Sequence, residues 1–471
     1  MADTNILEHA INQGKNLRNE VPRISHAAVG NIKRDPIKLL MESNKNRIER
    51  LVPLRYGRML ASPFAFYRGS ACIQAHDLST TPQTGLLQQI CGDAHIMNFG
   101  GFATPERNLV FDINDFDETH IAPWEWDIKR LAASVTIAAR ELGFKRNATD
   151  EMVFNAVEHY KKSIAEYAEM SALDIWYRKI TFDEMLASSI YDEGRKQIEK
   201  LMKKAEQRTH VNLLPKMAEK RDGKWVLNDE PPETFHIQGR ATLIAPNDKW
   251  MFTDQDKAIN LVFGKYLKTL APSHQLLLTR FKIQDMVFKV VGVGSVGTRC
   301  LALLLTDSHE NPLFIQVKQA LPSVLSPYIP KQKENDKQRG QQIVFGQRLM
   351  QSASDSFLGW AKGPLGYEFY FRQLRDMKIS AEIELLTEQV FGRYAWLCCD
   401  ILAHAHAKAG GLAAQMTGYL GNNTDFSEAI VRYANNYADV VESDYEKFRT
   451  ACRNSVLKAQ TDSDFKADLS I

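Results

Sequence analysis

The sequence predicts an α+β protein with a helix-rich large lobe and a smaller lobe built on an antiparallel sheet. Apolar residues recur at helical spacing in several long stretches, including residues 124–143, 148–210 and 387–409. Residues 281–321 instead contain β-rich runs separated by glycines and by a polar turn. Between these regions the periodicity weakens, and turn or linker residues gather at 222–224 and 230–233. A chain of 471 residues is also too long for one simple core, so we expect more than one lobe.

The composition excludes several classes of protein. Lys and Arg number 59 and Asp and Glu number 57, so the net charge is 59 − 57 = +2, which gives no argument for binding nucleic acid or an acidic membrane. The six cysteines form no C-x-x-C pair, the first thirty residues are polar, and no apolar run is long enough to span a bilayer. We therefore expect a cytoplasmic, water-soluble protein with no nucleic-acid or membrane partner; its oligomeric state is not predicted.

The first part of the chain offers few candidates for chemistry. Residues 34–50 have a Pro near a helix start and an amphipathic, basic pattern, which predicts a solvated helix. Residues 62–69, SPFAFYRG, predict an aromatic strand or loop with one basic residue, Arg68. The Arg68 guanidinium could bind a phosphate or a carboxylate, and a structural ion pair is an equally good interpretation.

Residues 90–118 concentrate polar groups that point to a metal site. Asp93, His95 and Asn98 fall in a tight glycine-containing loop, and a short strand then runs into Asp112 and Asp115. Clustered carboxylates repel one another and raise each other's pKa unless a counter-charge is present. Mg²⁺ is such a counter-charge, because it uses one or two carboxylates together with substrate phosphates. The alternative is an acidic turn in water.

The stretch G-D-x-H-x-x-N, followed by a strand and D-F-D, resembles the catalytic loop and metal-binding strand of the protein-kinase-like superfamily, especially its aminoglycoside and choline kinase branch. The resemblance implies that Asp93 orients or deprotonates the acceptor hydroxyl, while Asn98 and Asp115 hold Mg²⁺ on the phosphates of ATP. Asp112 competes with Asp115 for the last role, and Asp117 could take a second metal ion. Cys91 stands where the family pattern often has His. Asp127, near the start of the next helix, is expected to support this loop rather than to react.

The second half of the chain supplies a matching phosphate site. Gly292, Gly294 and Gly297 form G-x-G-x-x-G, and β-rich runs on either side are followed by Lys318. A helix after the glycines would indicate a dinucleotide fold, whereas strand, glycine loop, strand, turn and strand is the kinase order. The resemblance implies that the glycines cover the ATP phosphates and that Lys318 pairs with them. The alternatives are a hairpin bulge for the glycines and a solvated strand end for Lys318.

Three further segments complete the comparison with kinases. Residues 368–375 alternate like a strand and could form the hinge beside adenine, and the helix at 387–409 resembles the one before the catalytic loop. Its two histidines, His404 and His406, are two positions apart and do not share a helix face, so we expect them to be structural. The glutamate that pairs with the kinase lysine has no clear counterpart: Glu334 comes too early, and Gln342 and Gln347 are weaker partners.

The motifs SPFAFYRG, CGDAHIMNFG, NDFDE and PWEWDIKRLAAS occur in this order, and with them most of the chain closely resembles the DUF2252 family of bacterial proteins of uncharacterised function. Here the catalytic loop precedes the glycine loop, which is the kinase order read cyclically. We therefore expect a circularly permuted, two-lobed kinase-like fold. Residues 1–235 and 376–471 would form the helical lobe, and residues 236–375 the small nucleotide-binding lobe.

The leading hypothesis is an ATP- and Mg²⁺-dependent phosphotransferase acting on an unknown hydroxyl of a small molecule or a protein. Two alternatives keep the fold: nucleotidyl (AMP) transfer, and nucleotide binding without catalysis. A third is a metal-dependent phosphohydrolase. It would use His76, Asp77, Asp93, His95 and Asp115.

Overall fold

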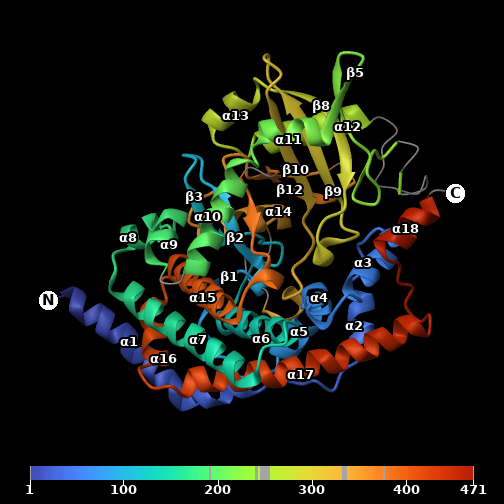
Figure 1. The fold of residues 1–471 in the computed structure, drawn as a ribbon. Coiled ribbons are helices and arrows are strands. Elements are labelled where there is room, and N and C mark those ends of the chain that lie inside the picture. Colours follow the sequence, from blue (N-terminus) through green and yellow to red (C-terminus); the bar gives the residue numbers. More distant parts are fainter. Residues whose placement is uncertain are drawn as a thin grey trace.

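A computed structural model describes residues 2–189, 192–238, 242–243, 255–330, 337–363, 365–374 and 377–469. It has an α+β architecture in which a sheet stands over a large assembly of helices (Figure 1).

The largest sheet is antiparallel throughout and has the strand order β11-β12-β10-β9-β8-β7. Its strands are β7 (Thr234–Phe235), β8 (Lys282–Lys289), β9 (Cys300–Thr306), β10 (Pro312–Gln319), β11 (Gly359–Lys362) and β12 (Glu368–Gln373). The predicted order of strand, glycine loop, strand, turn and strand is confirmed in β8, β9 and β10. The predicted strand at 368–375 is confirmed as β12 up to Gln373, and Arg375 lies outside the described residues.

The central strand β9 explains why this segment is a continuous apolar run. Leu303 and Leu305 pack into one hydrophobic cluster, whereas Ala302 and Leu304 pack into another. Successive side chains of a strand point to opposite faces, so both faces of the sheet are covered at this point. The neighbouring strand β10, which ends near Lys318, is buried along its whole length for the same reason.

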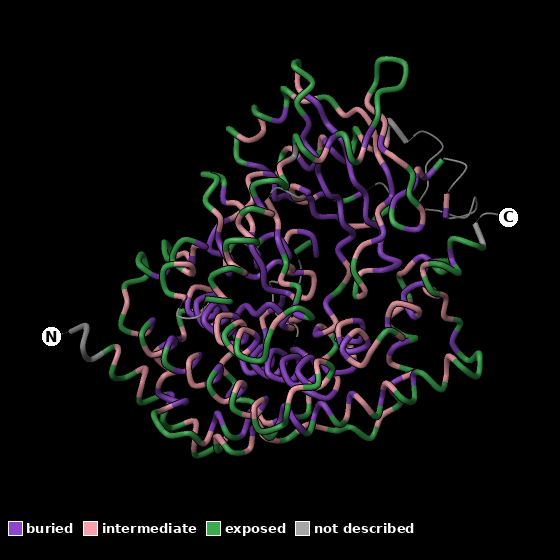
Figure 2. The backbone as a smooth tube through the Cα atoms, viewed as in Figure 1, coloured by how far each residue is buried: buried purple, intermediate pink, exposed green. Residues whose placement is uncertain are grey.

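The helices of the large assembly come from both ends of the chain. Those before the sheet are α1 (Ala2–Glu20), α2 (Pro36–Glu42), α3 (Val52–Met59), α4 (Pro63–Gly69), α5 (Ala71–Leu78), α6 (Glu125–Glu141), α7 (Arg146–Glu169), α8 (Ala172–Tyr177), α9 (Phe182–Ser188) and α10 (Asp192–Glu206). Helix α11 (His210–Met217) instead packs on β10 of the sheet. Those after it are α15 (Glu388–Gly410), α16 (Ala413–Leu420), α17 (Asp425–Arg453) and α18 (Asp462–Leu469). Helix α15 packs along α7, and α16 packs along α1. Figure 2 shows that the helices at the centre are buried, while the outer ones alternate between buried and exposed residues.

The remaining elements connect the sheet to the helices. Helices α12 (Gln255–Leu267) and α13 (Pro272–Leu278) precede β8, and α14 (Arg339–Met350) lies against β11, β12 and α15. The small sheets pair β1 (Leu87–Ile90) with β4 (His120–Pro123), β5 (Ala218–Arg221) with β6 (Lys224–Leu227), and β2 (Phe99–Ala103) with β3 (Leu109–Ile113) and β13 (Ile379–Ser380).

Three local predictions need correction. Residues 34–50, expected as one solvated helix, contain α2, which ends at Glu42, then a turn and a 3-10 helix at Glu49–Leu51. Residues 62–69, expected as a strand or loop, contain helix α4, because Ser62 caps it by accepting a hydrogen bond from the Ala65 N–H and Pro63 occupies its first turn. The stretch 148–210, expected to be uniformly helical, is divided into separate helices. Ser171 and Thr181 each cap a new helix there, and Thr181 does so in a reciprocal capping box with Glu184.

Candidate functional site

The acidic loop begins where β1 ends and is fixed by the first turn of α6. The Asp127 carboxylate accepts hydrogen bonds from the Cys91 N–H (2.7 Å) and the Gly92 N–H (2.8 Å). Gly92 has φ +81°, and a Cβ there would lie 2.3 Å from the Glu118 carbonyl oxygen. Glycine is therefore required at this turn, and Asp127 supports the loop, as the sequence indicated.

Asp93 is held by an arginine from the same helix. Arg130 donates from Nε to Asp93 Oδ1 at 2.8 Å, and its Nη2 lies 2.7 Å from the same oxygen. Arg130 also bonds Gln74 Oε1 and the Tyr67 carbonyl, and it lies over the Tyr67 ring. The other oxygen of Asp93, Oδ2, lies 3.9 Å from His95 Nε2. One oxygen of Asp93 is thus fixed, and the carboxylate as a whole is partly exposed.

Asn98 joins the two acidic segments. Its side-chain nitrogen donates to the backbone carbonyls of Asp93 (3.1 Å) and Asp115 (2.9 Å). The residue is buried directly before β2, which pairs with β3. The Asn98 side-chain nitrogen therefore bridges the loop at Asp93 and the segment after β3 at Asp115, and holds the two at a fixed distance.

Lys318 reaches the acidic site from β10. Its Nζ lies 3.4 Å from Asp115 Oδ2 and also forms an ion pair with Asp117 Oδ2. Burial lowers the pKa of Lys318, but the two carboxylates outweigh burial and hold that pKa well above its ordinary value. Burial likewise raises the pKa of Asp115, and the charges of Lys318 and Arg372 more than reverse this, so the Asp115 pKa lies well below its usual range. Residues about two hundred positions apart in sequence therefore form one charged cluster.

Asp117 connects this cluster to two other elements. Tyr370 on β12 donates to its Oδ1 at 2.7 Å, and Ser295 in the glycine loop donates to its Oδ2 at 3.3 Å. With Lys318 also on Oδ2, both oxygens of Asp117 already have protein partners. This arrangement favours a structural role for Asp117 rather than the second metal considered from the sequence.

The glycine loop lies against the helical lobe. It contains a short 3-10 turn, Val293–Ser295, and Arg47 donates to the carbonyls of Gly294 (2.8 Å) and Val296 (2.6 Å). Gly297 has φ +87°, a conformation that favours glycine, whereas a Cβ at Gly292 would meet no atom within 4 Å. The backbone of the loop is held in place, and Gly292 faces open space.

The expected partner of Lys318 on a following helix is replaced by the aspartates. Helix α14 is present, but Gln347 donates to Gln351 (3.0 Å), and Gln342 accepts from Arg339 (3.1 Å). Glu334 lies outside the described residues. Asp115 and Asp117 thus provide the counter-charge that the sequence left unassigned.

Asp112 is separated from this cluster by its own hydrogen bonds. Its Oδ2 accepts from the Ser352 N–H (2.7 Å) and hydroxyl (2.5 Å), and its Oδ1 accepts from the Ile113 N–H. Asp112 is almost fully buried. Of the two aspartates left open by the sequence, only Asp115 lies against Lys318.

The histidines of α15 have structural partners. His406 lies 3.3 Å from Asp127 Oδ2 and 2.7 Å from the Tyr160 hydroxyl, and His404 Nε2 lies 2.9 Å from the Ile175 carbonyl. His406 therefore helps to orient the carboxylate that fixes the acidic loop. These contacts agree with the structural role expected for both residues.

The residues of the phosphohydrolase hypothesis do not assemble around a metal. Asp77 accepts hydrogen bonds from Arg34 (2.6 Å) and Tyr437 (2.9 Å), and Asp93 is occupied by Arg130. Within the described ranges, no three His, Cys, Asp or Glu side chains are grouped as ligands of one ion. A metal held by protein side chains alone is therefore not supported in this part of the chain.

Comparison with known proteins gives a family. Residues 47–451 match the family of uncharacterized proteins conserved in bacteria, DUF2252. The chain belongs to this family. Neither the curated proteins nor the solved structures include a match to it. The helices that the structure describes in this DUF2252 protein include none with the length and apolar character needed to cross a membrane.

Sequence reasoning missed several residues that shape the site of this DUF2252 protein. Arg130 lies three positions after Asp127, so both occupy one face of α6, and this spacing could have indicated it. Arg47, Ser295 and Tyr370 bond across elements far apart in sequence, and nothing in their local sequence predicts those contacts.

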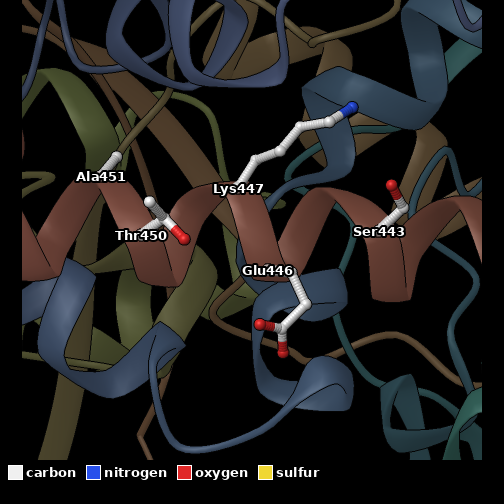
Figure 3. A pocket seen from close by; sticks show the side chains of 5 residues that line it. All are labelled: Ser443, Glu446, Lys447, Thr450 and Ala451. Atoms are coloured by element: carbon white, nitrogen blue, oxygen red, sulfur yellow. The ribbon is translucent and has the colours of Figure 1, made fainter.

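A hollow elsewhere on the DUF2252 chain has no connection with these residues. It follows one side of α17, where Figure 3 shows side chains spread along the helix surface. Its lining residues are Ser443, Glu446, Lys447, Thr450 and Ala451. We assign it no role in the chemistry.

Proposed function

We propose that this protein is an ATP- and Mg²⁺-dependent phosphotransferase with a circularly permuted kinase-like fold. The observation that carries the proposal is the 3.4 Å contact between Lys318 Nζ and Asp115 Oδ2. A kinase needs a phosphate-pairing lysine and a metal-binding aspartate within the span of one nucleotide. Here the two come from opposite halves of the chain, in the cyclic order that permutation requires.

The donor set at Asp115 fits Mg²⁺. Asp115 Oδ1 is buried and has no hydrogen-bond partner in the part of the chain that the structure describes, which is costly unless a cation or donor occupies that direction. Asn98 uses its amide nitrogen on two carbonyls, which leaves its side-chain oxygen as the atom that can bind a metal. Asn98 and Asp115 would hold the ion, whose charge would offset that of the ATP phosphates.

The protein's own groups would do the rest by positioning and charge. Gly292, Gly294 and Gly297 would cover the phosphates, and the Lys318 ammonium would pair with them once ATP competes for it. Asp93, with one oxygen fixed by Arg130, would accept a hydrogen bond from the acceptor hydroxyl through the other and orient it toward the γ-phosphate. The transfer would form the bond from the acceptor oxygen to phosphorus, break the bond from phosphorus to the β-phosphate oxygen, and pass the hydroxyl proton to Asp93.

Nucleotidyl transfer is a second candidate, because Lys318 pairs with aspartates rather than with a helix glutamate. The two reactions differ in their products. Phosphoryl transfer releases ADP, whereas AMP transfer releases pyrophosphate, so the product formed from ATP during prolonged incubation with Mg²⁺ separates them.

The proposal is tested by thermal melting with ATP, with and without Mg²⁺, on the wild type, Asp115→Asn and Lys318→Met. A ligand that binds the folded state increases the free energy of unfolding, by about 2.7 kcal/mol at a hundredfold excess over Kd, and so raises the melting midpoint. We expect ATP with Mg²⁺ to raise the wild-type midpoint and both variants to lose most of that shift. Lys362→Met, on an exposed lysine of β11, is the matched control and should keep it. An ATP shift that persists in Lys318→Met would refute the proposed pocket.

A further inference from the structure

We propose that Arg68 binds an anionic group of the acceptor, so that the substrate carries a carboxylate or a phosphate besides its reacting hydroxyl. This inference rests on the proposed function, because it concerns the acceptor side of the same site.

Arg68 is a charged side chain without a hydrogen-bond or ion-pair partner among the described residues. No hydrogen bond or ion pair of its guanidinium occurs in the described chain, and its Nε is buried without any acceptor. Its contact with an aromatic group is to the Phe64 ring, 5.9 Å from the centroid. Two other arginines of the site do have hydrogen-bond partners: Arg130 donates to Asp93, and Arg47 donates to two loop carbonyls. A buried donor left unpaired costs stability, which indicates that a ligand supplies the acceptor.

The position of Arg68 is the place where the two halves of the site meet. Helix α4, which carries it, packs on the 3-10 turn of the glycine loop. A Cβ at Gly294 would lie 3.4 Å from the Arg68 carbonyl oxygen. His95, which lies 3.9 Å from Asp93, also feels the charge of Arg68.

The charges that act on Arg68 differ from those that act on Lys318. Those acting on it are Asp93, Glu384, Arg130 and Glu141. Those acting on Lys318 are a separate set, Asp115, Asp117, Tyr370 and Arg372. Lys318 thus serves the side where phosphates of ATP would lie, whereas the charge of Asp93 acts on Arg68.

The chemistry of the ligand follows from the guanidinium. Its planar fork of N–H donors matches two oxygens of a carboxylate or a phosphate, and it has no means of accepting a hydrogen bond. His95 adds no charge at neutral pH, because burial lowers its pKa to about 4. The His95 Nδ1 is buried and has no hydrogen-bond partner within the described ranges, so it can bond a polar group of the same ligand.

The test uses inorganic phosphate as the probe, sodium acetate as the carboxylate probe, and sodium chloride at equal ionic strength as the control. Melting midpoints are measured for the wild type, Arg68→Gln, Lys318→Met and Arg449→Gln, the last being a half-exposed arginine on α17. We expect phosphate to raise the wild-type midpoint in a saturable way. Arg68→Gln should need at least tenfold more phosphate for the same shift. Arg449→Gln should respond like the wild type, and Lys318→Met should keep a saturable phosphate response, because the inferred anion site does not include Lys318.

Three results would overturn the inference: no effect of phosphate or acetate beyond chloride, an unchanged response in Arg68→Gln, or a response lost in Lys318→Met. The last would place the anion on the nucleotide side. Arg68→Lys keeps the charge but not the planar guanidinium, and provides a second test if Arg68→Gln does not fold. Its response to phosphate should be weaker than that of the wild type, and an equal response would also count against the inference.

ATP melting separates the two proposals. A phosphate response that depends on Arg68, together with no ATP effect, keeps the anion site and removes the phosphotransferase.

Discussion

Lys129 is a charged residue that the protein keeps in its core. It lies on α6 and has no exposed surface. Its Nζ lies 5.0 Å from the centre of the Tyr433 ring and has no hydrogen-bond partner among the residues that the structure describes. Burial lowers its pKa to about 7, and the nearby Glu125 opposes this only in part. Between pH 7 and 10.5 the unfolded chain therefore binds more protons at this residue than the folded chain, so the stability of the folded protein rises with pH across that window.

Replacing this lysine tests the argument. Lys129→Met should raise the free energy of unfolding by up to about 5 kcal/mol near pH 6, where the penalty is complete, and by progressively less toward pH 10. Urea unfolding at pH 6, 8 and 9.5 measures the difference. Lys162→Met, an exposed position on α7, should show no such trend. A gain for Lys129→Met that is equal at every pH would mean that packing, and not the charge, limits stability.

At the scale of elements, the glycine loop owes its position to a residue outside the sheet. Arg47 holds the Gly294 and Val296 carbonyls, while the Ile48 N–H bonds the Gly297 carbonyl at 2.7 Å. A loop that is already ordered loses less conformational entropy when it closes over a ligand. The loop thus depends on the segment that enters α3.

Loosening this loop should weaken nucleotide binding without unfolding the protein. Arg47→Met removes both charge-assisted hydrogen bonds from Arg47 to the loop, and one to the Ser43 carbonyl. We therefore expect faster hydrogen exchange at residues 292–298 and about tenfold weaker ATP binding, since such bonds contribute about 1.5–3 kcal/mol. Exchange mass spectrometry and calorimetry measure the two effects. Arg50→Met, on an exposed neighbour, should change neither. Faster exchange with unaltered ATP affinity would show that the loop does not cover the nucleotide.

At the scale of the whole molecule, the C-terminus stabilises the sheet. Phe465 on α18 is buried in the same hydrophobic cluster as Leu51 and Leu54 from the first part of the chain and Phe288 from β8. Arg58 pairs with Asp462 at 2.8 Å beside it. Segments from the beginning, middle and end of the sequence therefore share one core.

Phe465→Ala should lower the free energy of unfolding of the whole protein by about 3 kcal/mol, the usual cost of emptying an aromatic site in a core. Denaturant unfolding followed by both tryptophan fluorescence and circular dichroism measures it. Val456→Ala, a mostly exposed position in the same tail, should cost little. Should Phe465→Ala unfold only α18 and leave the main transition unchanged, the tail would be an appendage rather than a part of the core.

Local elements of this protein were largely predictable from the sequence. The strands around the glycine loop and the helices near 124–143 and 387–409 follow from hydrophobic periodicity, which is a local property. Predictions failed where local and wider influences compete. The aromatic residues of 62–69 suggested a strand or loop, but the Ser62 cap and Pro63 start a helix. The caps at Ser171 and Thr181 divide a long helical pattern.

By itself, the sequence determined which residue types could form the site: a carboxylate and amide group at 93–115 and a glycine and lysine group at 292–318. Only the tertiary structure decided their partners. It placed Lys318 against Asp115 and Asp117, paired Arg130 with Asp93 and bonded Asp112 to Ser352. Among the described residues it gave the buried Nε of Arg68 no acceptor. The reason is physical: charge pairing acts through space over a few ångströms, so it depends on which strands and helices meet, and no local pattern records that.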